Sequence, residues 1–149
     1  MYSKNEKSKL SEEFWTNFGK YLSPIKSAEG LTINWVNYKT GVKGIRFFMN
    51  VDTNICSIGI RLEHSDLELQ QIVFKEFERL KSQFISQIEE PWLWEMLVTE
   101  NDFIISKIFT KLELVNICNE DDWQKIISFL KPRLIKLDKF WCEFKYNFE

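Results

Sequence analysis

Two apolar stretches joined by three turn-forming residues constrain the fold of this chain more than any other feature of its sequence. Apolar residues occupy every second position from Ile45 to Val51 and again from Ile55 to Glu63. A period of two is typical of a β-strand that buries one face and exposes the other. Because Asp52-Thr53-Asn54 suits a tight turn, the two stretches predict an antiparallel hairpin.

Apolar residues at helical spacing precede and follow this hairpin. Ser3 and the glutamate three residues later have the spacing of a capping box, and the first helix that they open should end before Pro24. The same spacing at Ser65 and Glu68 predicts a second helix, whose apolar stripe extends to Ile88. The hairpin therefore lies between two amphipathic helices in the sequence.

A final helix is predicted from Asn119, whose side chain can cap it, to Phe144. Its apolar positions keep one phase through Pro132, which indicates one kinked helix or two abutting helices, because proline removes a helical hydrogen bond. Strand-like composition between turn residues marks further short strands. They are expected at Leu31 to Tyr38, Trp94 to Val98, Phe103 to Phe109 and Leu114 to Ile117.

The predicted fold class is α+β in a single domain of residues 1–149, with the order αβββα followed by a second short β region and a C-terminal kinked helix. That order is also the core order of restriction-endonuclease-like nucleases. Such a nuclease needs a carboxylate on the second strand and an acid-x-Lys pattern on the third, so that carboxylates hold magnesium. Asp52 can supply the first carboxylate, but Arg61-Leu62-Glu63 has the reverse order and no lysine.

Composition argues against several functional classes. No apolar run approaches the ~20 residues that span a bilayer, and the polar start is unlike a secretory signal, so the chain is expected in the cytoplasm. Cys56, Cys118 and Cys142 are widely spaced and odd in number, which predicts reduced thiols rather than a disulfide framework or a zinc site. With His64 as the only histidine and no nucleotide-binding motif, neither a metal nor a cofactor is expected.

The run from Asn34 to Gly41 is the sharpest local feature, with two amides, two large rings and a lysine before a glycine. Amides and cations can bind bases or phosphates while rings stack on unpaired bases. The alternative is structural, with Trp35 in the core and Asn37 stabilising the turn. The surrounding segment from Phe14 to Val51 is locally plus four, and the remainder of the chain is minus six.

Arg46, Arg61 and Glu63 are expected on the face of the predicted hairpin that points away from the core. They could form an electropositive site near the basic run, with one carboxylate to orient a ligand. The alternative is a set of cross-strand ion pairs. If a helix covers this face the charges become buried, and buried charge must be paired or used.

Three groups of residues resemble an uncharacterised bacterial family. They are Phe14-Trp15 with Phe18-Gly19, the run from Asn34 to Gly41, and Trp123 with Phe129-Leu130-Lys131-Pro132 and Asp138-Lys139-Phe140-Trp141. The family is known as domain of unknown function 4268, and the resemblance covers nearly the whole chain. It implies no activity. Some longer relatives resemble fusions to an endonuclease-like half, which implies a nucleic-acid context by association only.

The favoured hypothesis is a non-catalytic domain that binds nucleic acid or a nucleic-acid-processing partner. Its candidate ligand-binding residues are Asn34, Trp35, Asn37, Tyr38, Lys39, Lys43, Arg46, Arg61 and Glu63. One alternative is a protein-interaction or self-association module, such as a homodimer, with Trp92 and Trp94 in an exposed patch. A second alternative is a divergent metal-dependent nuclease that uses Asp52 and Glu63.

Overall fold

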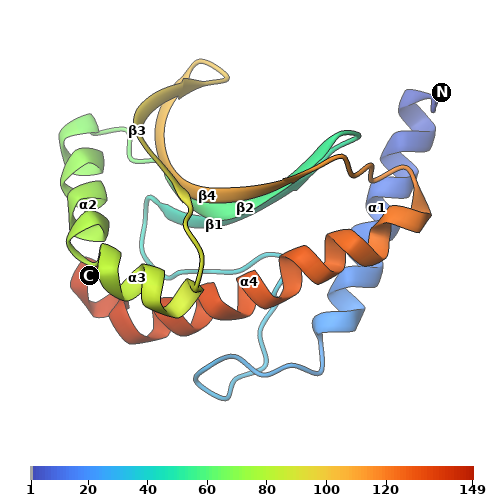
Figure 1. The fold of residues 1–149 in the computed structure, drawn as a ribbon. Helices are drawn as coiled ribbons and strands as arrows, with labels where there is room; N and C mark the ends of the chain where they lie inside the picture. Colours follow the sequence, from blue (N-terminus) through green and yellow to red (C-terminus); the bar gives the residue numbers. More distant parts are fainter. Residues whose placement is uncertain (1) are drawn as a thin grey trace.

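The computed structural model describes residues 2–149 and has an α+β fold (Figure 1). All four strands pair antiparallel in one sheet of order β1-β2-β4-β3. Two single turns of 3-10 helix flank the last helix, at Glu120–Asp122 and Lys145–Phe148. The longer elements are α1 (Lys4–Leu22), β1 (Ile45–Val51), β2 (Ile55–Leu62), α2 (Leu67–Arg79), α3 (Lys81–Ile88), β3 (Leu93–Glu100), β4 (Phe103–Glu113) and α4 (Trp123–Phe144).

The predicted hairpin of β1 and β2 is confirmed. Ile45 lies opposite Leu62 and Val51 opposite Cys56, and the Asp52 N–H donates a 2.9 Å hydrogen bond to the Ile55 carbonyl to close the turn. Alternate side chains of β2 point into the core, as the period of two predicts. These fully buried side chains are Cys56, Ile58, Ile60 and Leu62.

The predicted strand from Leu31 to Tyr38 is wrong, because this segment is irregular. The Asn34 carboxamide accepts a 3.2 Å hydrogen bond from the Asn37 N–H, and the Trp35 indole donates a 2.9 Å bond to the Ile25 carbonyl. Such side-chain bonds offer the backbone an alternative to strand pairing. The observed order is αββααββα rather than αβββα, and the restriction-endonuclease-like order is not confirmed.

The second predicted helix is two helices, α2 and α3, which meet at Leu80 (φ −94°, ψ 11°). No proline or glycine marks this break in the sequence. The cap of α2 is Asp66 rather than Ser65, because the Asp66 carboxylate accepts hydrogen bonds from the N–H groups of Glu68 and Leu69. The carboxylate also suits the positive end of a helix.

The second β region is confirmed, but its strands differ from those predicted. Strand β4 continues to Glu113, and the predicted strand from Leu114 to Ile117 is wrong, because Leu114 adopts a positive φ of 62° and turns the chain out of the sheet. A bulge interrupts the β3–β4 pairing between Glu95 and Val98. Bulges increase local twist and bend the strand.

Helices α3 and α4 lie on one side of the sheet, and α1 and α2 stand at its two ends (Figure 1). Helix α4 runs uninterrupted through Pro132, so it is not two abutting helices. In Figure 1, α3 and α4 lie along one face, α2 lies beside the β3–β4 hairpin, and within residues 2–149 no helix covers the other face. We call this uncovered side the open face. None of the helices in the described chain combines the length and the apolar character that crossing a membrane requires.

Candidate functional site

The run from Asn34 to Gly41 turns both of its large rings inward. Trp35 is only 2% exposed, and the Tyr38 ring stacks on Phe47 with 4.4 Å between the ring centroids. Trp35 therefore offers no face on which a base could stack, and one face of the half-buried Tyr38 ring is already covered. The structural alternative holds for Trp35, but the carboxamide that stabilises the turn is that of Asn34 rather than Asn37. The side chains of Asn34, Asn37 and Lys39 are exposed.

Asp138 of α4 is the buried partner of this run, although it is not among the predicted site residues. Its carboxylate accepts hydrogen bonds from the Tyr38 hydroxyl (2.5 Å), the Ala28 N–H (2.7 Å) and the Cys142 thiol (3.5 Å). A buried carboxylate needs such donors. The available signal was an acidic residue within the apolar phase of the last predicted helix, between Leu137 and Trp141.

The ionisable groups that contact Asp138 stay protonated at neutral pH. Burial, followed by the hydrogen bond to Asp138, raises the pKa of the Tyr38 phenol far above its usual range. Burial and the nearby Asp138 charge raise the pKa of the Cys142 thiol to about 12, so that the thiol stays protonated at pH 7 and is a poor nucleophile. Asn34, Asn37 and Lys39 line a pocket of about 410 Å³ over Asp138, but its acidic floor is already occupied by these donors.

The predicted group of Arg46, Arg61 and Glu63 does come together, on the open face. Glu63 accepts ion-pair contacts from Arg46 (3.2 Å) and Arg61 (2.9 Å). Arg61 also pairs with Glu100 of β3, which in turn pairs with Lys107 of β4 at 3.1 Å. The five residues form one alternating chain of charges across all four strands, so the prediction of cross-strand ion pairs is confirmed.

Three cations lie side by side within this chain of charges. Strand register places Arg46 directly opposite Arg61, and Arg61 directly opposite Lys107. Like charges at opposite strand positions repel unless carboxylates lie between them. Burial alone would raise the pKa of Glu100, but the hydrogen bonds from Lys107 and Arg61 outweigh it and lower that pKa. Glu100 thus remains a carboxylate that offsets the repulsion.

The charges of the open face balance. Its four basic side chains all have carboxylate partners, since Lys111 pairs with Glu113 at 3.6 Å and the other three belong to the chain of charges. Four acidic side chains lie on the same face. The basic set is Arg46, Arg61, Lys107 and Lys111, and the acidic set is Glu63, Glu95, Glu100 and Glu113.

An apolar row lies next to the row of cations. It consists of Phe48, Gly59, Phe109 and Leu93, which face one another across the four strands. Gly59 is required there, because a Cβ would lie 2.2 Å from the Ile108 carbonyl oxygen. The Lys107 ammonium lies 4.4 Å from the centroid of the Phe109 ring and covers it.

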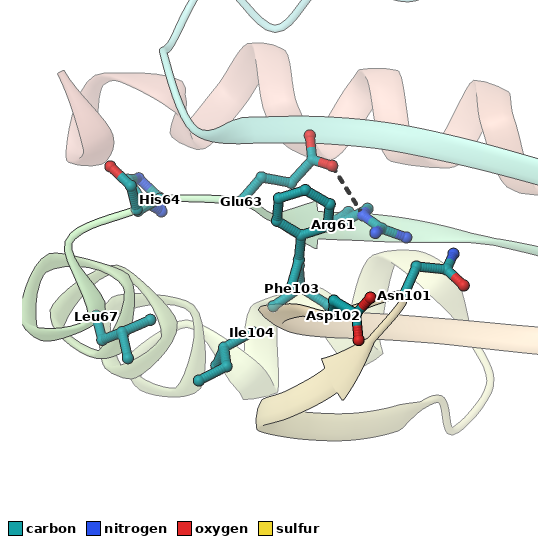
Figure 2. Close-up of a pocket in the computed structure, with 10 residues that line it drawn as sticks. Arg61, Glu63, His64, Leu67, Asn101, Asp102, Phe103 and Ile104 are labelled. Atoms are coloured by element: carbon teal, nitrogen blue, oxygen red, sulfur yellow. Dashed lines mark hydrogen bonds and ion pairs between the residues drawn. The ribbon is translucent and has the colours of Figure 1, made fainter.

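A pocket of about 700 Å³ opens where the chain of charges meets the β3–β4 hairpin and the start of α2. Figure 2 shows Phe103 between the Arg61–Glu63 ion pair and the apolar side chains Ile104 and Leu67. Phe103 is 69% exposed, and Ile104 and Leu67 are also exposed. Ligand pockets are typically apolar with a few polar groups that orient the ligand. The weak strand pattern of this hairpin gave no sequence signal for the pocket.

His64 lies on the rim of this pocket and also lines a smaller one beside Lys43. Gly44 (φ +88°) lies against the ring, since a Cβ there would come within 2.4 Å of the imidazole. Burial lowers the pKa of His64 and the Asp66 charge opposes it, so the ring is neutral at pH 7. His64 therefore adds an uncharged wall rather than a cation.

The acids required by a nuclease are not adjacent. Asp52 precedes β2 and Glu63 follows it, and a strand of this length separates them by roughly 25 Å at about 3.4 Å per residue. Asp52 instead pairs with Lys7 at 2.7 Å, and the hydrogen bond from Lys7 lowers the pKa of Asp52. Residues 2–149 contain no cluster of three potential metal-ligating side chains.

The aromatic patch expected at Trp92 and Trp94 is wrong for Trp92, which is buried. The Trp92 ring packs edge-on against Phe84, and its indole N–H donates to the Glu90 carboxylate at 3.0 Å. Trp94 is half-buried against the same phenylalanine. The exposed apolar side chains near this region lie instead on α2 and on the β3–β4 hairpin.

Comparison with known proteins adds a family but no activity. No curated protein matches the chain, and no solved structure matches it. The model of the family described as domain of unknown function DUF4268 matches residues 10–145, which include the irregular run, the sheet, the hairpin pocket and all of α4. This chain belongs to the DUF4268 family.

Proposed function

We propose that this chain is a non-catalytic binding domain that recognises a segment of another protein on the open face of its sheet. The partner places an apolar side chain in the hairpin pocket, beside Phe103, Ile104 and Leu67. Polar groups of the same segment meet the ion pair of Arg61 and Glu63 on the pocket rim. A partner that processes nucleic acid would fit the longer relatives that resemble fusions to an endonuclease-like half.

The observation that carries this proposal is the pocket itself. It combines exposed apolar side chains with a rim whose charges are already paired, and protein interfaces have this composition, with an apolar centre and a polar rim. Exposed apolar side chains that lie together beside polar groups are typical of ligand-binding grooves. Phe103 is 69% exposed and is not isolated, because Ile104 and Leu67, which line the same pocket, are exposed as well.

Nucleic acid is the second candidate, favoured by the row of Arg46, Arg61 and Lys107 on three adjacent strands. Phosphate binding gains its free energy from cations that release counterions. Each of these cations already has a carboxylate partner, and the whole chain carries a net charge of −2. The protein segment is therefore the better-supported ligand.

The test is a selection of peptides from a random library displayed on phage, with the purified chain as bait. Enriched peptides should share an aromatic or branched apolar residue, and they should bind in solution with a Kd in the range of about 1–100 μM, measured by fluorescence anisotropy. The variants Phe103→Asp and Leu67→Asp should each weaken this binding at least tenfold.

Leu114→Asp is the matched control, because Leu114 is 88% exposed and does not line the pocket. It should bind the selected peptides as the wild type does. The same assay with fluorescent single-stranded oligonucleotides at low salt tests nucleic acid, the second candidate ligand. Salt-sensitive oligonucleotide binding that Arg61→Ala weakens, together with no enriched peptide, would replace the protein segment by nucleic acid.

A further inference from the structure

The two edge strands of the sheet differ in how they are protected. Strand β3 carries a bulge between Glu95 and Val98, with Leu97 at a positive φ of 54°, and bulges are a common device against edge-to-edge pairing. Strand β1 at the other edge is regular over seven residues and contains neither proline nor lysine. An unprotected edge strand is a template for another strand.

The alternation of backbone hydrogen bonds along β1 shows which of its N–H and C=O groups do not bond to β2. The Glu63 N–H donates to the Gly44 carbonyl, and the Asp52 N–H donates to the Ile55 carbonyl, so even-numbered residues of β1 bond to β2. Odd-numbered residues therefore direct their N–H and C=O groups outward. Ile45 is satisfied there, since its N–H donates to the Val42 carbonyl (3.2 Å) and its carbonyl accepts from the Thr40 hydroxyl (2.7 Å).

Three consecutive outward positions remain, at Phe47, Met49 and Val51. Among residues 2–149, no hydrogen bond reaches their six backbone groups from outside the sheet. In Figure 1, α1 passes the hairpin end of the sheet and no helix of the described chain runs along β1. The edge is therefore open over the length of a short strand.

We propose that β1 pairs with β1 of a second copy of this chain, antiparallel and centred on Met49. In this register Met49 faces the partner's Met49, and Phe47 faces the partner's Val51. All six free backbone groups of each copy are then bonded. A shift by two residues toward the start of β1 would require the groups of Ile45, which are already used, and a shift the other way would leave Phe47 beside the hairpin turn.

Charge complementarity supports the same register. Arg46 comes to lie opposite the partner's Asp52, and the twofold axis repeats this pair at the other end of the contact. Within one copy Arg46 pairs with Glu63 and Asp52 with Lys7, but their side chains are 57% and 51% exposed, so both remain accessible to the partner. Opposite charges at facing strand positions stabilise a sheet, whereas like charges there destabilise it.

The dimer would have one continuous sheet. A twofold axis perpendicular to the sheet keeps both open faces on the same side and both copies of α3 and α4 (Figure 1) on the other. The two hairpin pockets then lie at opposite ends of a single eight-stranded surface. This inference does not depend on what the pockets bind.

The test is sedimentation equilibrium of the full chain between about 10 μM and 1 mM, a range that suits the weak association expected of a small interface. The wild type should change from monomer to dimer over this range. Met49→Pro should raise the dimer Kd at least tenfold. The outward N–H of Met49 takes no part in the β1–β2 ladder, and proline is tolerated at such edge positions.

Thermal unfolding should show that Met49→Pro remains folded, whereas Asn50→Pro should lose much of its stability, because the Asn50 N–H bonds to β2. If Met49→Pro does not fold, charge exchange decides the question. Arg46→Asp and Asp52→Arg should each weaken the dimer, and the double variant should restore it. A wild type that stays monomeric at every concentration, a folded Met49→Pro that dimerises normally, or a double variant without recovery would overturn the proposal.

Discussion

The Asn34 to Gly41 run and the β3–β4 hairpin both place large side chains on tight turns of the backbone, and they direct them oppositely. In the run, the Trp35 indole and the Tyr38 hydroxyl each find a hydrogen-bond acceptor inside the protein. In the hairpin, Phe103 points outward and has no polar atom to satisfy. An arrangement of amides and aromatic rings can therefore hold a loop to a core, whereas the surface that we propose for binding lies on a hairpin with a weak sequence pattern.

Removing a ring that points into the core should cause the largest loss of stability among the variants of these two regions. Trp35→Ala should lower the free energy of unfolding by roughly 3–5 kcal/mol, because it leaves a cavity and removes the bond to Ile25. Urea unfolding followed by far-ultraviolet circular dichroism measures the change. A loss below about 1 kcal/mol would mean that Trp35 is not a core residue and would reopen its role as a ligand-binding ring.

Replacing Asp138 tests the polar contacts that hold the same run to the core. Asp138→Ala should cost about 3 kcal/mol, because the Tyr38 hydroxyl and the Ala28 N–H would remain buried without an acceptor. The matched control is Asp121→Ala, an exposed acid that should change stability by less than about 0.5 kcal/mol. Equal stability of the two variants would show that the run is not held by Asp138.

On the open face, the chain of charges should make a smaller contribution that depends on pH. The pKa of Glu100 is lower in the folded protein than in the unfolded chain, so its pairing stabilises the fold above the unfolded pKa and is lost as pH falls through the folded pKa. Glu100→Gln should cost about 1 kcal/mol at pH 7 and much less at pH 3. A cost that is the same at both values would contradict this account.

The smallest effect on stability is expected in the hairpin. Phe103→Ala should change the free energy of unfolding by less than about 0.5 kcal/mol, because the side chain is largely in water. The same variant should weaken the binding of selected peptides at least tenfold. A stability loss comparable to that of Trp35→Ala would assign Phe103 to the core and remove the main support for the pocket.

The sequence predicted helices and strands well where interactions between neighbouring residues determine the local structure. The period of two in β1 and β2 and the Ser3 cap of α1 were sufficient, because burial and capping act on neighbouring residues. The strand expected at residues 31–38 failed because bonds from Trp35 to Ile25 and from Tyr38 to Asp138 join distant parts of the chain. No local pattern contains such bonds.

The candidate site was predicted in part for the same reason. Arg46, Arg61 and Glu63 were placed together because strand alternation fixes which side chains share a face. Glu100 and Lys107 were missed, since their positions depend on the order of strands in the sheet. The pocket was missed because it forms only where α2 meets the β3–β4 hairpin.

We propose that ligand binds at the hairpin pocket, and we infer that the Asn34 to Gly41 run is structural. The most direct measurement is the change in backbone amide chemical shifts when a selected peptide is titrated into the isotope-labelled chain. We expect the largest changes at Leu67, Phe103, Ile104 and Ile105. Largest changes at Asn34, Asn37 and Lys39, with the hairpin unaffected, would contradict it.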